Sequence, residues 1–212
     1  MTLRLSRLGP RLIAVAAACL VFAGTPRSAG SDERPAVDPG NLTGKLLVAA
    51  PSMDDPNFAK SVIFMVEHNE HGALGIVINR VLGAAPAAEV LKGLGIQADG
   101  ASGQIRVFLG GPVEPQVAFV LHSTDYSNPD TRNIADGVAV TGDAKILEAI
   151  SRGEGPHKSL LALGYAGWGP GQLESEMARD SWYVAPADPN IVFGDDITAT
   201  WKRALATSGV DL

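Results

Sequence analysis

Short apolar runs rich in Val, Ile and Leu constrain the fold of this chain more than any other feature of its sequence. Runs of this kind predict β-strands, since strands are short and enriched in β-branched residues. The predicted strands cover residues 45–50, 61–66, 75–79, 106–109, 117–122, 137–140, 158–163 and, more weakly, 182–184. Several runs are apolar throughout, which predicts strands that are covered on both faces.

Amphipathic segments that predict helices are fewer than the predicted strands. Residues 143–152 carry one apolar stripe and end at a glycine, and residues 196–206 repeat apolar residues at helical spacing, with Trp201 on the stripe. Residues 87–94 and 170–178 are further candidates. Because helices and strands are interspersed without strict βαβ alternation, the sequence predicts an α+β fold, a single compact domain with helices packed on a mixed β-sheet.

The first 30 residues have the pattern of a secretory signal peptide. Arg4, Arg7 and Arg11 precede an apolar run over residues 12–23, and small residues follow. The run is shorter than the roughly 20 residues that a membrane span needs. We therefore expect cleavage within residues 23–31 and an exported, periplasmic protein. A start codon placed too early on a cytoplasmic protein is the alternative.

The rest of the chain fits one domain, residues 42–212, preceded by polar residues 31–41 that predict a disordered linker. A formal net charge of -6 argues against direct nucleic-acid binding, which needs Lys and Arg to displace counterions. The glycine pattern over residues 93–98 follows a predicted helix rather than a strand, so it does not indicate a dinucleotide. We expect no cofactor, no membrane span in the mature chain, and an unknown protein or small molecule as the partner.

Residues 164–171 are the most distinctive stretch, with four glycines and a proline around two aromatic rings. Glycines allow close backbone approach and positive φ, so we expect a loop that presents the rings of Tyr165 and Trp168. Polar residues at the start of the predicted helix follow at once. These residues either favour the positive end of the helix dipole or belong to a binding site; they are Gln172, Glu174 and Glu176.

Further candidate binding residues lie where predicted strands end. They are a turn carboxylate, a polar pair and a glycine turn: Asp55, Asn79, Arg80, Gly110 and Gly111. Strands that end at one edge of a sheet bring such residues together, and binding sites favour such rims. We therefore expect these residues and residues 164–171 to form one concave surface.

Two histidines are candidate bases. His68 lies in the polar segment 67–71, whose spacing does not match a zinc motif, so we expect no metal site. His122 ends the apolar run over residues 117–122. A hydrolase or transferase would need one of them within about 2.6–3.2 Å of Asp55 or Glu174. No nucleophile elbow is present, so a non-catalytic binding or regulatory protein is the favoured hypothesis and the enzyme is its alternative.

Several blocks taken together resemble the YqgE/AlgH family of bacterial proteins. They occur in the family's order and cover nearly all of the predicted domain: residues 46–58, 66–69, 72–80, 110–113, 119–122, 164–168, 171–176 and Trp182. The resemblance implies an α+β fold with an unusual sheet topology, and it implies no reaction, although members are often labelled transcriptional regulators. The chain departs from the family in its leader and in residues 114–116, where an Asp-Arg pair is common.

Overall fold

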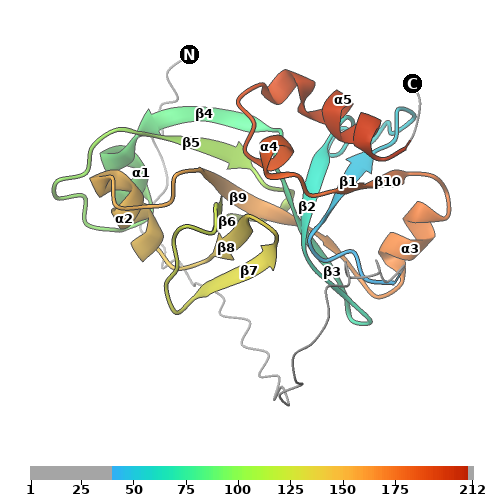
Figure 1. The fold of residues 1–212 in the computed structure, drawn as a ribbon, viewed down its shortest axis with the longest axis horizontal. Coiled ribbons are helices and arrows are strands. Elements are labelled where there is room, and N and C mark those ends of the chain that lie inside the picture. Colours follow the sequence, from blue (N-terminus) through green and yellow to red (C-terminus); the bar gives the residue numbers. More distant parts are fainter. Residues whose placement is uncertain (1–39, 210–212) are drawn as a thin grey trace.

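The fold was obtained as a computed structural model, which describes residues 40–209 and is drawn as a ribbon in Figure 1. The predicted leader, residues 1–30, and nearly all of the predicted linker lie outside the described residues. Among residues 40–209, no helix is both long enough and apolar enough to cross a membrane.

Ten strands of the described chain form one curled sheet (Figure 1). They are β1 (Lys45–Ala49), β2 (Val62–Asn69), β3 (Gly72–Val77), β4 (Val81–Pro86), β5 (Gln104–Leu109), β6 (Val113–His122), β7 (Thr131–Ala135), β8 (Val138–Thr141), β9 (Ser159–Trp168) and β10 (Trp182–Pro186). Their order is β10-β1-β2-β3-β9-β6-β8-β7, while β5 lies beside β9 and β4 beside β5. Only β5 and β9 pair in parallel, so within residues 40–209 the sheet is mixed, as predicted.

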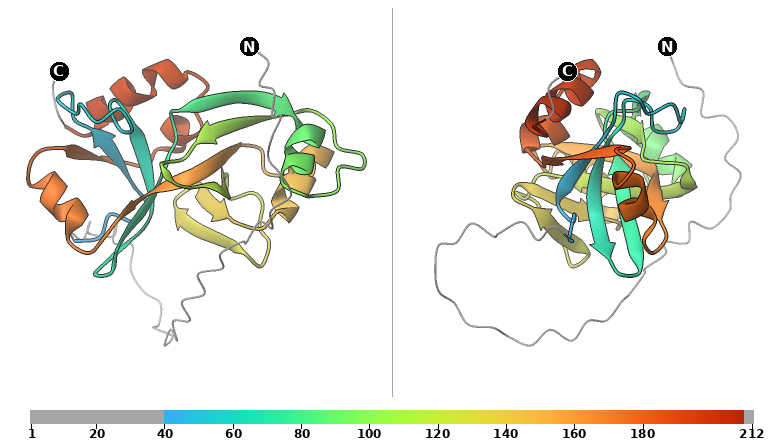
Figure 2. Two further views of the ribbon diagram at one scale, coloured as in Figure 1. Left: turned by 180° about the vertical axis from the view of Figure 1, so that it is seen from behind. Right: turned by 90° about the vertical axis from the view of Figure 1, so that its right-hand side faces the viewer.

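Helices pack on this sheet at both ends of the molecule. The described helices are α1 (Ala87–Gly93), α2 (Lys145–Arg152), α3 (Gln172–Met177), α4 (Pro189–Val192) and α5 (Ile197–Thr207). Helices α1 and α2 pack together at one end, and α5 packs on β10, β1 and β2. Helix α3 lies at the opposite end, beside β3 and β10 (Figure 2). The α+β prediction is therefore confirmed.

The buried apolar side chains form three clusters. One packs the sheet against α4 and α5 and includes Phe64 and Trp201. A second, at the α3 end, includes Trp168 and Trp182. The third packs β5, β6 and β9 against α1 and α2. The second cluster is the one that supports most of the candidate site.

Strand β9 is the centre of the sheet because it pairs with three others. Its first half pairs with β5, its second half with β3, and its opposite edge with β6. The strand bends at Gly164, whose φ of 73° lies in the left-handed region that favours glycine. A Cβ on Gly111 would lie 2.1 Å from the carbonyl carbon of Tyr165. The turn between β5 and β6 therefore crosses β9 with the two backbones in contact.

The prediction of a loop over residues 164–171 is wrong for most of that stretch. Strand β9 continues through Trp168, since its last residues pair with β3. Gly164 bends the strand instead of ending it, and buried and more exposed residues keep alternating to Trp168. Only residues 169–171 connect β9 to α3.

Candidate functional site

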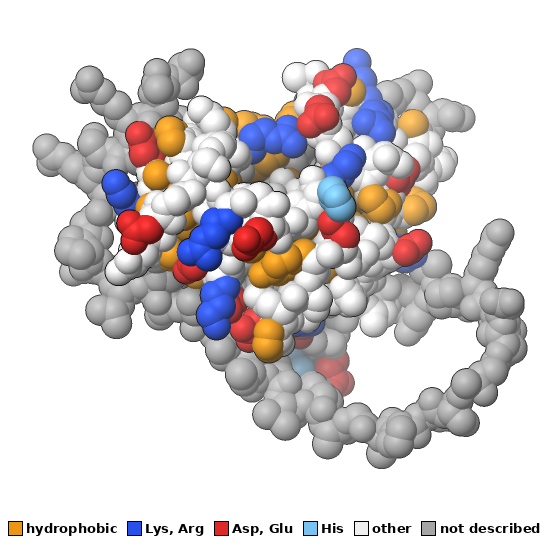
Figure 3. Space-filling view, turned by 60° about the vertical axis from the view of Figure 1, so that its left-hand side comes forward, with side chains coloured by type: hydrophobic (Ala, Val, Ile, Leu, Met, Phe, Trp, Pro, Cys, Tyr) orange, Lys and Arg blue, Asp and Glu red, His pale blue; other side chains and the backbone are white. Residues whose placement is uncertain are grey.

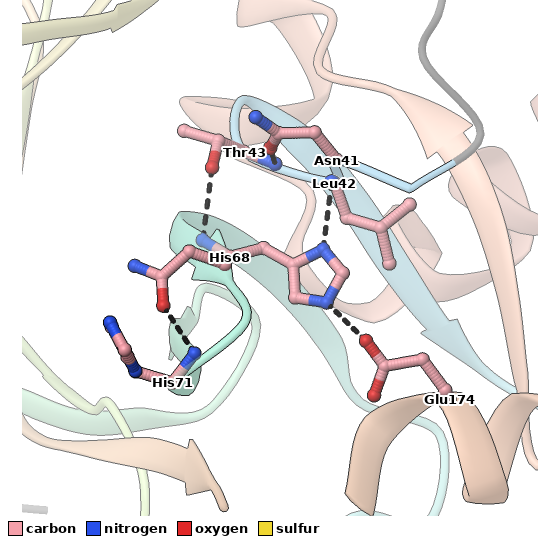
Figure 4. A network of polar contacts seen from close by, with 7 residues as sticks. Asn41, Leu42, Thr43, His68, His71 and Glu174 are labelled. Atoms are coloured by element: carbon pink, nitrogen blue, oxygen red, sulfur yellow. Dashed lines mark hydrogen bonds and ion pairs between the residues drawn. The ribbon is translucent and has the colours of Figure 1, made fainter. Parts of the chain in front are cut away.

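His68 is the centre of a hydrogen-bond network at the end of β2 (Figure 4). Its ring is only 5% exposed, and Nε2 lies 2.8 Å from Oε1 of Glu174. Nδ1 lies 3.1 Å from the backbone nitrogen of Leu42. A backbone N–H can only donate, so Nδ1 must accept and the ring proton must lie on Nε2. His68 is therefore the neutral Nε2–H tautomer, and it donates to Glu174.

The segment before β1 holds His68 in place. Oγ1 of Thr43 accepts a hydrogen bond from the backbone N–H of His68 at 3.0 Å. The backbone N–H of Gly44 donates to the carbonyl of Met65 at 2.8 Å. The side chain of Leu42 is buried in the apolar cluster at the α3 end. Residues 42–44 thus fix both the main chain and the ring of His68 through hydrogen bonds.

Glu174 is the solvent-facing member of this pair. It lies in α3, and its side chain is 57% exposed. A hydrogen bond from its own backbone N–H, and then the bond from His68, hold the pKa of Glu174 below its ordinary value. The carboxylate is therefore ionised at neutral pH, fixed on one side by an imidazole and open to solvent on the other.

Glu176, one turn away from Gln172, holds an aromatic cluster together. Its Oε2 accepts from the indole N–H groups of Trp168 at 2.9 Å and Trp182 at 2.8 Å. Its Oε1 accepts from the side-chain amide of Gln172 at 2.9 Å. The ring of Phe58 stacks on Trp168 with centroids 6.5 Å apart. Gln172 and Glu176 are therefore used to build the fold around α3.

Trp168 is not the exposed ring that the sequence predicted. It is 7% exposed and lies in the same apolar cluster as Leu173. The indole N–H finds its acceptor in Glu176, so the ring can be buried at no polar cost. Trp168 contributes to the site by fixing α3, on which Glu174 stands.

Asn79 uses its side chain to hydrogen-bond the main chain at the start of β2. Its side-chain oxygen accepts from the backbone N–H of Val62 at 2.9 Å. Its side-chain NH₂ donates to the carbonyl of Lys60 at 2.9 Å. Asn79 thus shapes the loop between β1 and β2.

Arg80 and Asp55 hold the same loop. The guanidinium of Arg80 donates to the carbonyls of Pro56 at 3.0 Å and Ala59 at 3.3 Å. The carboxylate of Asp55 accepts from the backbone N–H of Asn57 at 2.8 Å, which is ordinary turn chemistry. This loop places Phe58 against Trp168.

The glycine turn at Gly110 and Gly111 lies where the chain crosses β9. A Cβ on Gly110 would lie 2.2 Å from the carbonyl oxygen of Gly164, and the Gly110 N–H donates to Leu163 at 2.7 Å. Tyr165, also on β9, packs edge-on against Phe119. Burial and the nearby carboxylate of Glu114 raise the pKa of Tyr165. Gly110, Gly111 and Tyr165 therefore lie where the two backbones cross.

His122 is buried and has partners of its own. Its Nδ1–H donates to the carbonyl of Ser123 at 2.9 Å, and Nε2 lies 2.9 Å from Oγ1 of Thr141. Burial lowers the pKa of His122, so the ring is neutral. Both ring nitrogens are occupied, which leaves neither for the expected carboxylate partners, Asp55 or Glu174.

Three contributors to the site were not predicted from the sequence. The Leu42 amide is a backbone group and therefore leaves no signal in the side-chain pattern. Phe58 and Trp182 complete the aromatic cluster, and both lie within the blocks that carry the family resemblance. Within residues 40–209, no group of three or more His, Cys, Asp and Glu side chains is placed to hold a metal ion.

A mixed, curled sheet with one central strand defines a single α+β domain, in which a buried histidine is hydrogen-bonded to a surface glutamate. The chain belongs to the AlgH-like family, whose model matches residues 46–212.

Relatives and solved structures agree with this assignment. A protein of Afipia carboxidovorans is 46% identical over 179 residues, covering 81% of this chain and 85% of the relative. One of Methylococcus capsulatus is 43% identical over 172 residues, covering 81% and 94%. The solution structure of AlgH from Pseudomonas aeruginosa matches with a TM-score of 0.67 and 39% identity, covering 88% of this chain and 94% of AlgH. A crystal structure from Corynebacterium diphtheriae matches with a TM-score of 0.63 and 25% identity, covering 77% and 85%.

Proposed function

We propose that this protein is a non-catalytic binding or regulatory protein whose site is centred on His68 and Glu174. The observation that supports it most is that both ring nitrogens of His68 are already hydrogen-bonded. A general base needs a free lone pair within reach of the proton that it removes. His68 has none, because the Leu42 amide occupies Nδ1 and the ring proton occupies Nε2.

The chemistry of Glu174 indicates the class of ligand. Its carboxylate is ionised and open to solvent, so it accepts hydrogen bonds and attracts positive charge. Charge-assisted hydrogen bonds to a guanidinium or an ammonium are the strongest that such a group forms. Because His68 already fixes one oxygen, the carboxylate loses little freedom on binding. The proposed ligand is therefore a cationic group of a peptide, a protein or a small molecule.

A hydrolase or transferase is the second candidate, favoured by the 2.8 Å distance between His68 and Glu174. In it Glu174, and not His68, would have to remove the proton. A carboxylate with a lowered pKa is a weak base at neutral pH, which favours binding over this reaction.

An NMR titration of the full-length protein with two capped tripeptides tests the proposal. One peptide carries a central arginine and the other a central glutamate in an otherwise identical sequence. We expect the arginine peptide to cause saturable shifts of amide signals in α3, and the glutamate peptide to cause none. The Glu174→Gln variant keeps the shape of the side chain but removes its charge, and it should weaken arginine-peptide binding about tenfold or more.

Glu70→Gln is the matched control, since Glu70 is an exposed carboxylate in the turn between β2 and β3 whose ion pair is to the exposed His71. It should leave the affinity for the arginine peptide unchanged. Equal affinity of the wild type and the Glu174→Gln variant would refute the cation site. Turnover of an ester or phosphate substrate that is lost in Glu174→Gln would favour the second candidate.

A further inference from the structure

We infer that the backbone amide of Leu42 is a positioning group of this site: it fixes His68 in the Nε2–H tautomer and so aligns the carboxylate of Glu174. The inference rests on the proposed function only where it assigns ligand binding to Glu174. Residues 41–44, at the entrance of the chain into the domain, are called the strap below.

The direction of the two hydrogen bonds to the His68 ring determines its tautomer. The nitrogen of Leu42 lies 3.1 Å from Nδ1 of His68, and a main-chain N–H cannot turn round to accept (Figure 4). A hydroxyl or a side-chain amide in this place could reverse its role and tolerate either tautomer. With Nδ1 held as the acceptor, Nε2 has only a proton to offer, and that proton lies toward Oε1 of Glu174 at 2.8 Å.

The strap itself is fixed by contacts on both sides of Leu42. The side chain of Leu42 is 5% exposed in the cluster that contains Trp168 and Leu173. The backbone N–H of Lys45 donates to the carbonyl of Leu42 at 2.9 Å. Thr43 accepts the backbone N–H of His68 at 3.0 Å. The Leu42 amide is therefore held toward the ring by the fold.

Gly44 shows that the strap is fitted closely to the rest of the domain. Its φ is 75°, and a Cβ built there would lie 2.8 Å from the carbonyl oxygen of Ile134. Its N–H donates to Met65 on β2 at 2.8 Å. The strap thus contacts both β2 and β7. Displacement of the strap would remove the hydrogen bond from Leu42 to the ring of His68.

Displacement of the strap would change which ring nitrogen of His68 carries the proton. Without the Leu42 amide, either ring nitrogen can carry the proton. In the Nδ1–H tautomer, a lone pair on Nε2 would point at the carboxylate of Glu174, and the two acceptors would repel each other. The strap therefore determines whether Glu174 is held in a defined position or turned away from His68.

Nitrogen NMR of the full-length protein labelled with ¹⁵N tests this inference directly. We expect the His68 ring of the wild type to show a protonated, pyrrole-type Nε2 and an unprotonated, pyridine-type Nδ1. We also expect a scalar coupling through the hydrogen bond between the Leu42 amide nitrogen and Nδ1. This measurement needs no variant. A protonated Nδ1, or the absence of the coupling, would overturn the inference.

Two variants at Leu42 separate its amide from its side chain. Leu42→Pro removes the N–H, and Leu42→Ala keeps the N–H but removes most of the buried side chain. We expect Leu42→Pro to lose the single tautomer and to bind the arginine peptide about fivefold more weakly, the loss expected for one hydrogen bond. Leu42→Ala should keep the tautomer. An unchanged tautomer in a folded Leu42→Pro variant would contradict the inference.

The two readouts keep the inference and the proposed function distinguishable. If Leu42→Pro changes the tautomer and weakens peptide binding, both are supported. If it changes the tautomer while neither it nor Glu174→Gln alters peptide binding, the tautomer control stands and the proposed cation site fails. If peptide binding depends on Glu174 but the wild type shows no defined tautomer, the cation site stands and the role of Leu42 fails.

Discussion

Glu176 links the aromatic cluster to α3 at one end of the molecule. One of its oxygens accepts from two indole N–H groups, and the other accepts from Gln172. Glu176→Gln offers only one carbonyl oxygen and turns an NH₂ group toward the amide of Gln172. We expect the free energy of unfolding to fall by about 1–3 kcal/mol.

Urea unfolding followed by tryptophan fluorescence measures this change, because two of the affected groups are tryptophans. Glu70→Gln is the control, since Glu70 is exposed and its loss should leave the urea midpoint in place. An unchanged midpoint for Glu176→Gln would mean that the indole hydrogen bonds do not stabilise the fold.

His122 should make the stability of the protein depend on pH. Burial lowers the pKa of His122 in the folded state below its ordinary value of 6.5. The unfolded chain therefore takes up a proton at a higher pH than the folded chain does. The stabilisation is fully present above about pH 6.5 and is lost as the pH falls through the lowered pKa.

The variant His122→Gln isolates this contribution from those of the other histidines. We expect the urea midpoint of the wild type to fall more between pH 7.5 and pH 5.5 than that of His122→Gln. Parallel curves for the two proteins would show that His122 does not control this loss of stability.

His68 and His122 illustrate how far the chemistry of side chains could be predicted from the sequence. The sequence singled out His68 and Glu174, and the structure brings them within 2.8 Å. It could not show that a backbone amide determines the tautomer of His68, because such a contact depends on the path of the chain. The sequence also could not exclude His122 from the candidate site. An apolar run with a final histidine has the same pattern whether the ring is buried or faces a cleft.

At the scale of elements, the β5–β6 turn crosses β9 at a close backbone contact. Gly111 has a φ of 157°, and a Cβ there would lie 2.1 Å from the backbone of Tyr165. Gly111→Ala must therefore push two strands apart, and we expect it to destabilise the domain far more than the loss of glycine freedom alone.

Gly100→Ala is the matched control for this prediction. Its φ of 73° is also positive, but no atom lies within 4 Å of the position that a Cβ would take. It should cost only about 1 kcal/mol of backbone strain. Equal urea midpoints for the two variants would show that β9 can move aside at the crossing.

Elements with a strong apolar period were predictable, and those without one were not. Helix α5 was predicted from its stripe, and its Trp201 is buried and donates to the carbonyl of Ala49 at 2.8 Å. Strand β4 was missed because small residues and a proline dominate it, and β7 because exposed polar residues interrupt it. Both pair with only one other strand, so packing demands little of their side chains.

For the whole molecule, the distribution of charge supports the expectation that duplex DNA is not a partner. Lys and Arg side chains are interspersed with Asp and Glu on the face shown in Figure 3, and the net charge of the chain is -6. We expect no complex with duplex DNA at physiological salt in a filter-binding assay. A sequence-specific complex of nanomolar affinity would contradict this expectation.

The leader remains a prediction from the sequence, because residues 1–30 lie outside the described part of the structure. We expect the protein isolated from its native cell to begin within residues 24–31, after removal of the leader. Mass spectrometry of the intact protein from periplasmic and cytoplasmic fractions measures this directly. A cytoplasmic protein that retains the leader would instead support the misplaced start codon.

The central position of β9 also determines the order in which the domain can form during synthesis. Strands β3, β5 and β6 all pair with residues 159–168, which leave the ribosome after them. A nascent chain that ends before Ser159 therefore has three strands without their shared partner, and the sheet cannot close. The sheet can therefore be completed only after residues 159–168 have been synthesised.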